Sequence, residues 1–181
     1  MKKKHLSMIA LAIPFAALLS GCSITDSLTD KLDESVSKSA KTSAEGVESG
    51  LLPGWVPEGG TDVELEQRST GNERLFTMVY TGELPKDQCT PIATTGKPSK
   101  DELAASYAKD NRTKNSDVED FATVPTLSAD WWADGSEKKT TDLCGRWWVH
   151  QEDGKLYAFA PDTQSQVDGI LQERKVAESK S

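Results

Sequence analysis

Basic residues are scarce in this sequence relative to acidic ones. It contains 21 Lys and Arg against 29 Asp and Glu, and its formal net charge is −8. Binding to nucleic acid depends on Lys and Arg side chains that neutralise phosphates, so this balance argues against a nucleic-acid partner. The acidity is instead typical of a surface kept soluble by charge repulsion.

Long apolar runs are also missing. The apolar stretch at residues 6–19 has 14 residues, including Ser7 and Pro14, and falls short of the ~20 needed to span a bilayer comfortably. Three lysines at residues 2–4 precede it, and small residues follow it. This order of positive, apolar and small residues is typical of a secretory signal peptide.

The segment ends in Leu19-Ser20-Gly21-Cys22, which resembles the lipobox of bacterial lipoproteins, with Cys22 at the lipidated position. The resemblance covers the first 22 residues. It implies a signal peptide at 1–21, cleavage before Cys22, diacylglycerol on the Cys22 sulfur and often a further fatty acid such as palmitate. Two acyl chains give a stable anchor, whereas one binds reversibly. We therefore expect a lipid-anchored protein on the extracytoplasmic face of the cell membrane.

Removing residues 1–21 changes the chemistry that is available. The Lys and Arg count falls from 21 to 18 against 29 carboxylates, so the mature side-chain charge is −11. His5 is also lost, which leaves His150 as the one histidine. Common hydrolase, metalloprotease, phosphate-loop and calcium-loop motifs are absent. No cofactor, metal or reaction is assigned from the sequence.

Residues 22–53 predict a polar tether after the lipidated cysteine. They are rich in Ser, Thr, Asp, Lys, Glu and Ala, and such a segment buries too little apolar surface to offset its ordering entropy. A short membrane-proximal helix is the alternative. Apolar residues and turn formers appear together at residues 51–57, so we expect a globular domain at 54–162 and a weak helix or tail at 163–181.

Local patterns predict two hairpins and one internal helix. Alternation at residues 62–68 and the run at 75–80 flank turn-forming residues 69–72. Ser99 and Glu102 match a capping box that opens a helix to about residue 109. Its predicted buried stripe is formed by Leu103, Ala104, Tyr107 and Ala108. Residues 127–132 predict a further short strand.

The clearest signal is Asp153-Gly154 between two apolar runs, which suits a type I′ turn. This turn pairs residue 152 with 155, 150 with 157 and 148 with 159. One face then carries Trp148, His150, Tyr157 and Phe159, and the other carries Trp147, Val149, Leu156, Ala158 and Ala160. A sheet that is apolar on both faces needs a cover, and the 99–109 helix is a candidate for one face.

These elements predict an α+β domain with an antiparallel sheet. Outside the cytoplasm, Cys89 and Cys144 predict one disulfide. The disulfide would close a loop of roughly 55 residues, which stabilises the fold by ~4 kcal/mol on the chain-entropy model. A reactive thiol or metal pair is the competing interpretation, and the sequence offers no CxxC spacing to support it.

The five tryptophans are the most suggestive functional feature. The neighbours Trp131-Trp132 and Trp147-Trp148 each place one ring on either side of a strand. If one face is open, the candidate binding residues are Trp148, His150, Tyr157 and Phe159; if both are covered, the rings are packing. We expect a non-catalytic module that binds an envelope glycan or protein. A small envelope hydrolase using His150 or a carboxylate pair, and a structural spacer, are the alternatives.

The body also resembles small uncharacterised lipoproteins of actinobacteria, through Leu52-Pro53-Gly54-Trp55-Val56-Pro57 and Cys144-Gly145-Arg146-Trp147-Trp148-Val149. This resemblance implies a setting with a single membrane and supports the disulfide. It implies no established activity.

Overall fold

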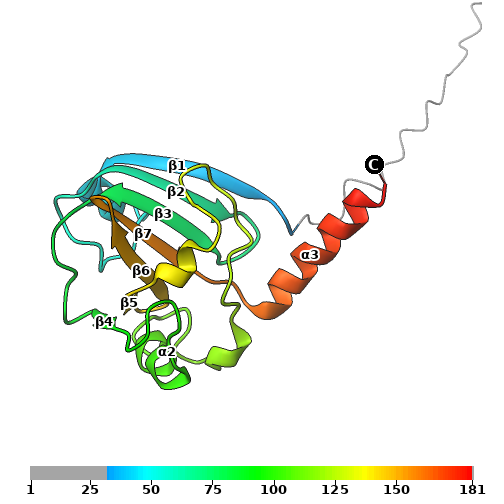
Figure 1. The fold of residues 1–181 in the computed structure, drawn as a ribbon. Coiled ribbons are helices and arrows are strands. Elements are labelled where there is room, and N and C mark those ends of the chain that lie inside the picture. The colour runs from blue at the N-terminus through cyan, green and yellow to red at the C-terminus, as the bar shows by residue number, and fades with distance from the viewer. Residues whose placement is uncertain (1–31, 181) are drawn as a thin grey trace, which may run out of the picture. The chain divides into compact units, whose positions relative to one another are not determined.

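Residues 32–180, the part described by the computed structural model, form a seven-stranded antiparallel sheet (Figure 1). The strand order is β1-β2-β3-β7-β6-β5-β4. The strands are β1 (Ser35–Thr42), β2 (Thr61–Arg68), β3 (Arg74–Val79), β4 (Cys89–Pro91), β5 (Asp142–Cys144), β6 (Trp147–Glu152) and β7 (Lys155–Ala160). The predicted α+β class with an antiparallel sheet is confirmed.

Helical segments in the same range are α1 (Ser43–Glu48), α2 (Lys100–Tyr107) and α3 (Gln164–Glu178), with short 3-10 turns η2 (Val118–Asp120) and η3 (Ser136–Lys139). Helix α2 lies beside β5, whereas α3 projects away from the sheet (Figure 1). None of the helices within residues 32–180 is long and apolar enough to cross a membrane. The predicted signal peptide and Cys22 lie outside the described residues.

Both predicted hairpins are confirmed. Strands β2 and β3 pair, and β6 and β7 pair with residue 148 opposite 159, 150 opposite 157 and 152 opposite 155. Asp153 and Gly154 both have positive φ, at 51° and 76°, as the predicted type I′ turn requires. The turn residues therefore set the register of the aromatic strands.

The two faces of the sheet carry separate apolar cores. One face contributes Val63, Leu65, Phe76, Met78, Trp147, Val149, Leu156, Ala158 and Ala160, and is covered by Leu52, Trp55 and Val56. The other contributes Leu75, Leu143, Trp148 and Phe159, and is covered by Leu127 and Trp132. The predicted division of β6 and β7 between two buried faces is correct.

The disulfide between Cys89 and Cys144 is confirmed. The two cysteines lie opposite each other on β4 and β5, with Cα atoms 4.1 Å apart. It closes a loop of 55 residues, which contains α2 and the polar turns that follow it. On the chain-entropy model, closing a loop of this length restricts the unfolded chain and stabilises the fold by about 4 kcal/mol.

Helix α2 begins with the predicted capping box. Ser99 Oγ accepts from Glu102 N at 3.3 Å, and Glu102 Oε2 accepts from Ser99 N at 2.6 Å. The predicted stripe is partly wrong, because Ala104 and Ala108 are exposed while Ser106 is buried and donates to Gly145 O. Leu103 and Tyr107 do face the sheet, and the Tyr107 hydroxyl accepts from Trp148 Nε1 at 3.1 Å.

The predicted tether ends earlier than expected. Residues 35–42 form β1, which pairs with β2 from Ser35–Arg68 to Thr42–Thr61, and residues 43–48 form α1. The polar composition misled the prediction because an edge strand is held by backbone hydrogen bonds rather than by side-chain burial. The domain therefore begins near residue 32 instead of 54.

Two further segments differ from expectation. Residues 127–132 do not form a strand; they cross the second core as irregular chain, with Leu127 and Trp132 buried. Conversely, the predicted weak helix or tail is a 15-residue helix, capped by Thr163 and buried at Val167 and Ile170. Gly169 is accommodated because a Cβ there would lie 2.7 Å from Leu32 Cδ1, so the glycine permits a close contact.

Candidate functional site

The predicted aromatic platform is closed by the chain that crosses it. Trp148, His150 and Phe159 are 4%, 2% and 1% exposed, and Tyr157 is half-buried. The Trp132 ring lies over this face, with its centroid 6.2 to 6.4 Å from the rings of His150, Tyr157 and Phe159. Of the two interpretations that the sequence leaves open for these four residues, the structure supports the covered face, in which the rings pack together.

His150 lies in the core rather than in a catalytic arrangement. Its ring stacks on Tyr157 at 5.0 Å and 10°, and its Nδ1 has no hydrogen-bond partner among residues 32–180. Burial lowers the pKa of His150 to about 4, which keeps the imidazole neutral. A general base needs a reachable proton and an orienting partner, and His150 has neither within the described chain.

The same sheet face becomes polar where it continues onto β2 and β1. Glu64 lies opposite Ser39, and Glu66 lies opposite Ser37, so all four side chains share one face. Glu66 is 7% exposed and accepts a 2.5 Å hydrogen bond from Ser37 Oγ. The alternation at residues 62–68 puts Glu64, Glu66 and Arg68 on one face of the strand, and the structure buries Glu66 and Arg68.

A groove of about 510 Å³ lies over this polar face; we call it the β1–β2 groove. Its floor is formed by residues 37–39 and 64–66, and its opposite wall by residues 128–131. The wall contributes the exposed Asp130 and the half-buried Trp131, whose ring packs edge-on against Trp132 with centroids 6.4 Å apart. The groove thus combines an aromatic surface with carboxylates and serine hydroxyls.

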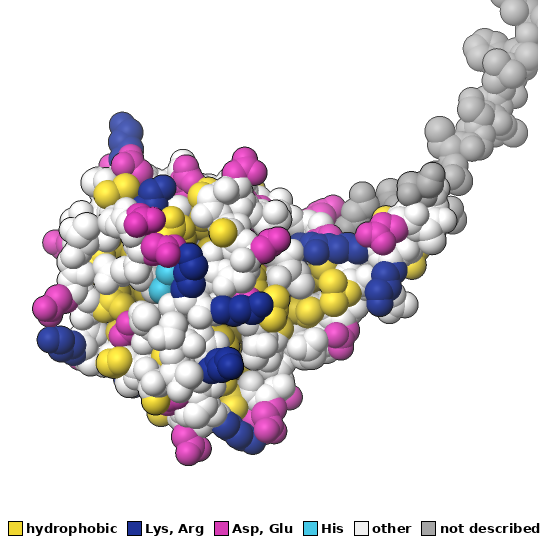
Figure 2. All heavy atoms as spheres, in the orientation of Figure 1, with side chains coloured by type: hydrophobic (Ala, Val, Ile, Leu, Met, Phe, Trp, Pro, Cys, Tyr) yellow, Lys and Arg dark blue, Asp and Glu magenta, His cyan; other side chains and the backbone are white. Residues whose placement is uncertain are grey.

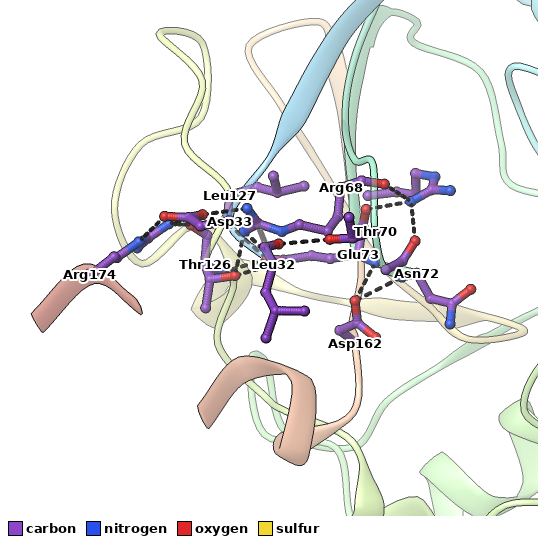
Figure 3. A network of polar contacts seen from close by, with 12 residues as sticks. Leu32, Asp33, Arg68, Thr70, Asn72, Glu73, Thr126, Leu127, Asp162 and Arg174 are labelled. Carbon is purple, nitrogen blue, oxygen red and sulfur yellow. Dashed lines mark hydrogen bonds and ion pairs between the residues drawn. The ribbon is translucent and has the colours of Figure 1, made fainter. Parts of the chain in front are cut away.

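A buried polar network, drawn in Figure 3, fixes the wall of the groove. The carboxylate of Glu73, which is 1% exposed, accepts from Thr126 N at 2.5 Å, from Thr126 Oγ1 at 2.5 Å and from Leu127 N at 3.0 Å. Arg68 donates to Thr126 Oγ1 and pairs with Glu73 at 3.3 Å. These contacts hold the start of the 128–131 segment against the sheet.

The network also fixes the point where the chain enters the domain. Asp33 lies between Arg68 and Arg174 and pairs with them at 2.5 and 2.6 Å (Figure 3). Hydrogen bonding to Arg174, and then to Arg68, lowers the pKa of Asp33 despite its partial burial. The backbone N–H groups of Leu32 and Asp33 donate to the Glu173 carboxylate on α3. Its charges are paired with one another, so the network is structural.

Carboxylate, histidine and cysteine side chains elsewhere in residues 32–180 are not arranged as a metal site. Acidic and basic groups are interspersed over the face seen in Figure 2. Within residues 32–180 there is no group of three or more His, Cys, Asp or Glu side chains placed to hold a metal ion.

No known protein family, curated protein or solved structure matches this chain. The site is therefore interpreted from its own chemistry. Sequence reasoning missed the β1–β2 groove because β1 was not predicted, and the pairing of Ser37 with Glu66 depends on that strand. The available signal was the alternation of Ser35, Ser37 and Ser39, which puts three hydroxyls on one face of a strand.

Proposed function

We propose that this protein is an extracytoplasmic lipoprotein whose folded domain binds an envelope glycan, without cleaving it, in the β1–β2 groove. The observation that carries the proposal is one open groove that is lined by the half-buried Trp131, by Glu64 and Glu66, and by Ser37 and Ser39. The sequence offered the aromatic face of β6 and β7 as the candidate binding surface, and the structure covers that face. The β1–β2 groove lies where the same face of the sheet continues onto β2 and β1.

The chemistry of the groove suits sugar rings. An indole offers a flat apolar surface on which a pyranose can stack. Carboxylates accept hydrogen bonds from the hydroxyls of a sugar, and serine hydroxyls can donate or accept them. A volume of about 510 Å³ lies within the range of small-molecule sites. Since Glu64, Glu66 and Asp130 are acidic, the groove favours neutral or amino sugars over anionic ones.

The test is co-sedimentation of the protein with purified peptidoglycan, together with titration by soluble amino-sugar oligomers. We expect Trp131→Ala to weaken binding about tenfold, or 1.4 kcal/mol, while Trp131→Phe retains part of the affinity because it keeps a stacking surface. Glu64→Gln should also weaken binding, because a carboxylate accepts a stronger hydrogen bond than an amide.

Glu58→Gln is the matched control, since Glu58 is exposed and does not line the groove. Equal losses in Glu58→Gln and Glu64→Gln would contradict the proposal, as would unchanged binding in Trp131→Ala. Release of soluble sugar by the wild-type protein would instead support the hydrolase alternative with a carboxylate pair. Absence of any binding would favour the structural spacer.

The proposed anchor rests on the lipobox at residues 19–22. Labelled fatty acid is expected to enter the protein in bacterial cells and to be lost in Cys22→Ser, with the unprocessed precursor accumulating. The disulfide variant Cys89→Ser is a useful control, because it removes a cysteine without touching the predicted lipidation site. Labelling that persists in Cys22→Ser would refute lipid attachment at this sulfur.

A further inference from the structure

Three arginines meet at a tight turn on the opposite side of the sheet. Arg74 Nη1 donates to the carbonyls of Gly71 at 3.2 Å and Glu73 at 2.8 Å. Arg146 Nη2 donates to Asn72 O at 2.9 Å, and Arg112 Nη1 donates to Asn72 Oδ1 at 3.4 Å. The turn at residues 71–73 thus gathers three guanidinium groups from three separate parts of the chain.

These guanidiniums line a pocket of about 300 Å³, which we call the arginine pocket. Its other walls are Trp147, Gln67 and the segment 50–53. Gln67 and Trp147 belong to the face of the sheet opposite Glu64 and Glu66, and the arginine pocket shares no lining residue with the β1–β2 groove. The arginine pocket therefore has a basic wall, formed by the three arginines, and an apolar wall, formed by Trp147 and residues 51–53.

Positive charge in the pocket exceeds its local compensation. Asp110 is the carboxylate that lines it, and its Oδ2 lies 3.8 Å from Arg146 Nε. Asp162 lies nearby, but it accepts from the backbone N–H groups of residues 72, 73 and 163. Among residues 32–180, neither Arg74 nor Arg112 forms an ion pair within 4 Å. The local charge is unusual in a chain with a net charge of −8.

Donors are also left over. Arg74 makes its hydrogen bonds through Nη1, and so does Arg112, so the Nε and Nη2 groups of both donate to no acceptor within residues 32–180. Burial, followed by the charge of Arg112, lowers the pKa of Arg74. Burial also lowers the pKa of Arg146 to about 10, against the opposing effect of Asp110 and with the charges of Arg112 and Arg74 adding to it. An anion would relieve this repulsion and accept the free N–H groups.

We infer that the arginine pocket binds a phosphate group carried on a small organic moiety. A single guanidinium can satisfy a carboxylate through a bidentate pair. A phosphate has more acceptor oxygens and more negative charge, so it suits a group of three guanidiniums. The apolar wall of Trp147 and residues 51–53 provides space for the part of the ligand that carries the phosphate. Free phosphate and the glycerol phosphate of lipid headgroups or wall polymers share this chemistry.

Calorimetric titration of the purified protein with inorganic phosphate, glycerol 3-phosphate and acetate tests the inference. We expect both phosphates to bind more tightly than acetate, with affinity falling as salt rises. Tighter binding of glycerol 3-phosphate than of inorganic phosphate supports a phosphate carried on an organic moiety, and the reverse order would overturn that part of the assignment. Binding of acetate as tight as that of phosphate would overturn the assignment, and so would the absence of binding.

Arg112→Gln is the decisive variant, because Arg112 is exposed and its loss does not open the core. We expect it to raise the Kd for phosphate about tenfold. Lys114→Gln is the matched control: it removes the same charge two residues away, is exposed and does not line the pocket. Equal effects of the two substitutions would show a response to net charge alone and would overturn the site. Sugar binding in the β1–β2 groove should be unchanged in both variants.

Discussion

The charge state of His150 is set by the aromatic rings around it. Burial lowers its pKa to about 4, whereas an unfolded histidine titrates near 6.5. Since the folded pKa lies below the unfolded one, the contribution of His150 to stability is fully present above about pH 6.5 and is lost as the pH falls towards 4. The difference corresponds to about 3 kcal/mol.

We therefore expect the free energy of unfolding to fall with decreasing pH through this window, and His150→Phe to flatten that dependence. Urea unfolding between about pH 7 and pH 4 measures both. Asp33 does not contribute to the pH dependence in this range, because its pKa is lowered from 3.8 and it is protonated only at more acidic pH. The same slope in His150→Phe and in the wild-type protein would contradict the assignment of this titration.

At the level of elements, the irregular segment 126–131 depends on one buried carboxylate. Glu73 accepts hydrogen bonds from Thr126 and Leu127 and pairs with Arg68, and both members of that pair are 1% exposed. In Glu73→Gln, Arg68 loses a charged partner inside the protein, and the amide group turns a donor toward backbone N–H groups. We expect a loss of about 3 kcal/mol or more in the free energy of unfolding.

The segment should also loosen, so sugar affinity in the β1–β2 groove should fall together with stability. Thermal unfolding and the sedimentation assay on the same preparations check both effects. Glu58→Gln again serves as the isosteric control at an exposed site. A stable Glu73→Gln protein with intact sugar binding would show that the segment is held by its apolar contacts alone.

The contrast between strands explains how far the sequence could predict the fold. Asp153-Gly154 fixes the β6–β7 register locally, and the Ser99–Glu102 capping box starts α2 locally, so both were predictable. Strand β1 has no such local signature, because its stability comes from pairing with a partner about 20 or more residues away in sequence. The segment that covers Trp148 and His150 could not be predicted either, because it is irregular chain without a periodic pattern.

On the scale of the whole molecule, the sheet separates two chemically different surfaces, each of which we propose as a binding site. The acidic β1–β2 groove lies on one face and the basic arginine pocket lies on the other. Neither could be predicted from the net charge of −8, because each depends on which few side chains the strand register and the turn at 71–73 bring together. Composition therefore excludes partners for the molecule as a whole more reliably than it predicts local sites.

The contacts that hold residues 32 and 33 against α3 have a mechanical consequence. Any tension that arrives through the preceding chain meets the Asp33 pairs with Arg68 and Arg174, and the Glu173 contacts, before it reaches β1. Without these contacts, a pull on Ser35 would separate β1 from β2 one residue pair at a time, and the floor of the groove would be lost. If the chain is anchored as we propose, these ion pairs would bear a pull on the anchor first, and β1 would stay paired with β2.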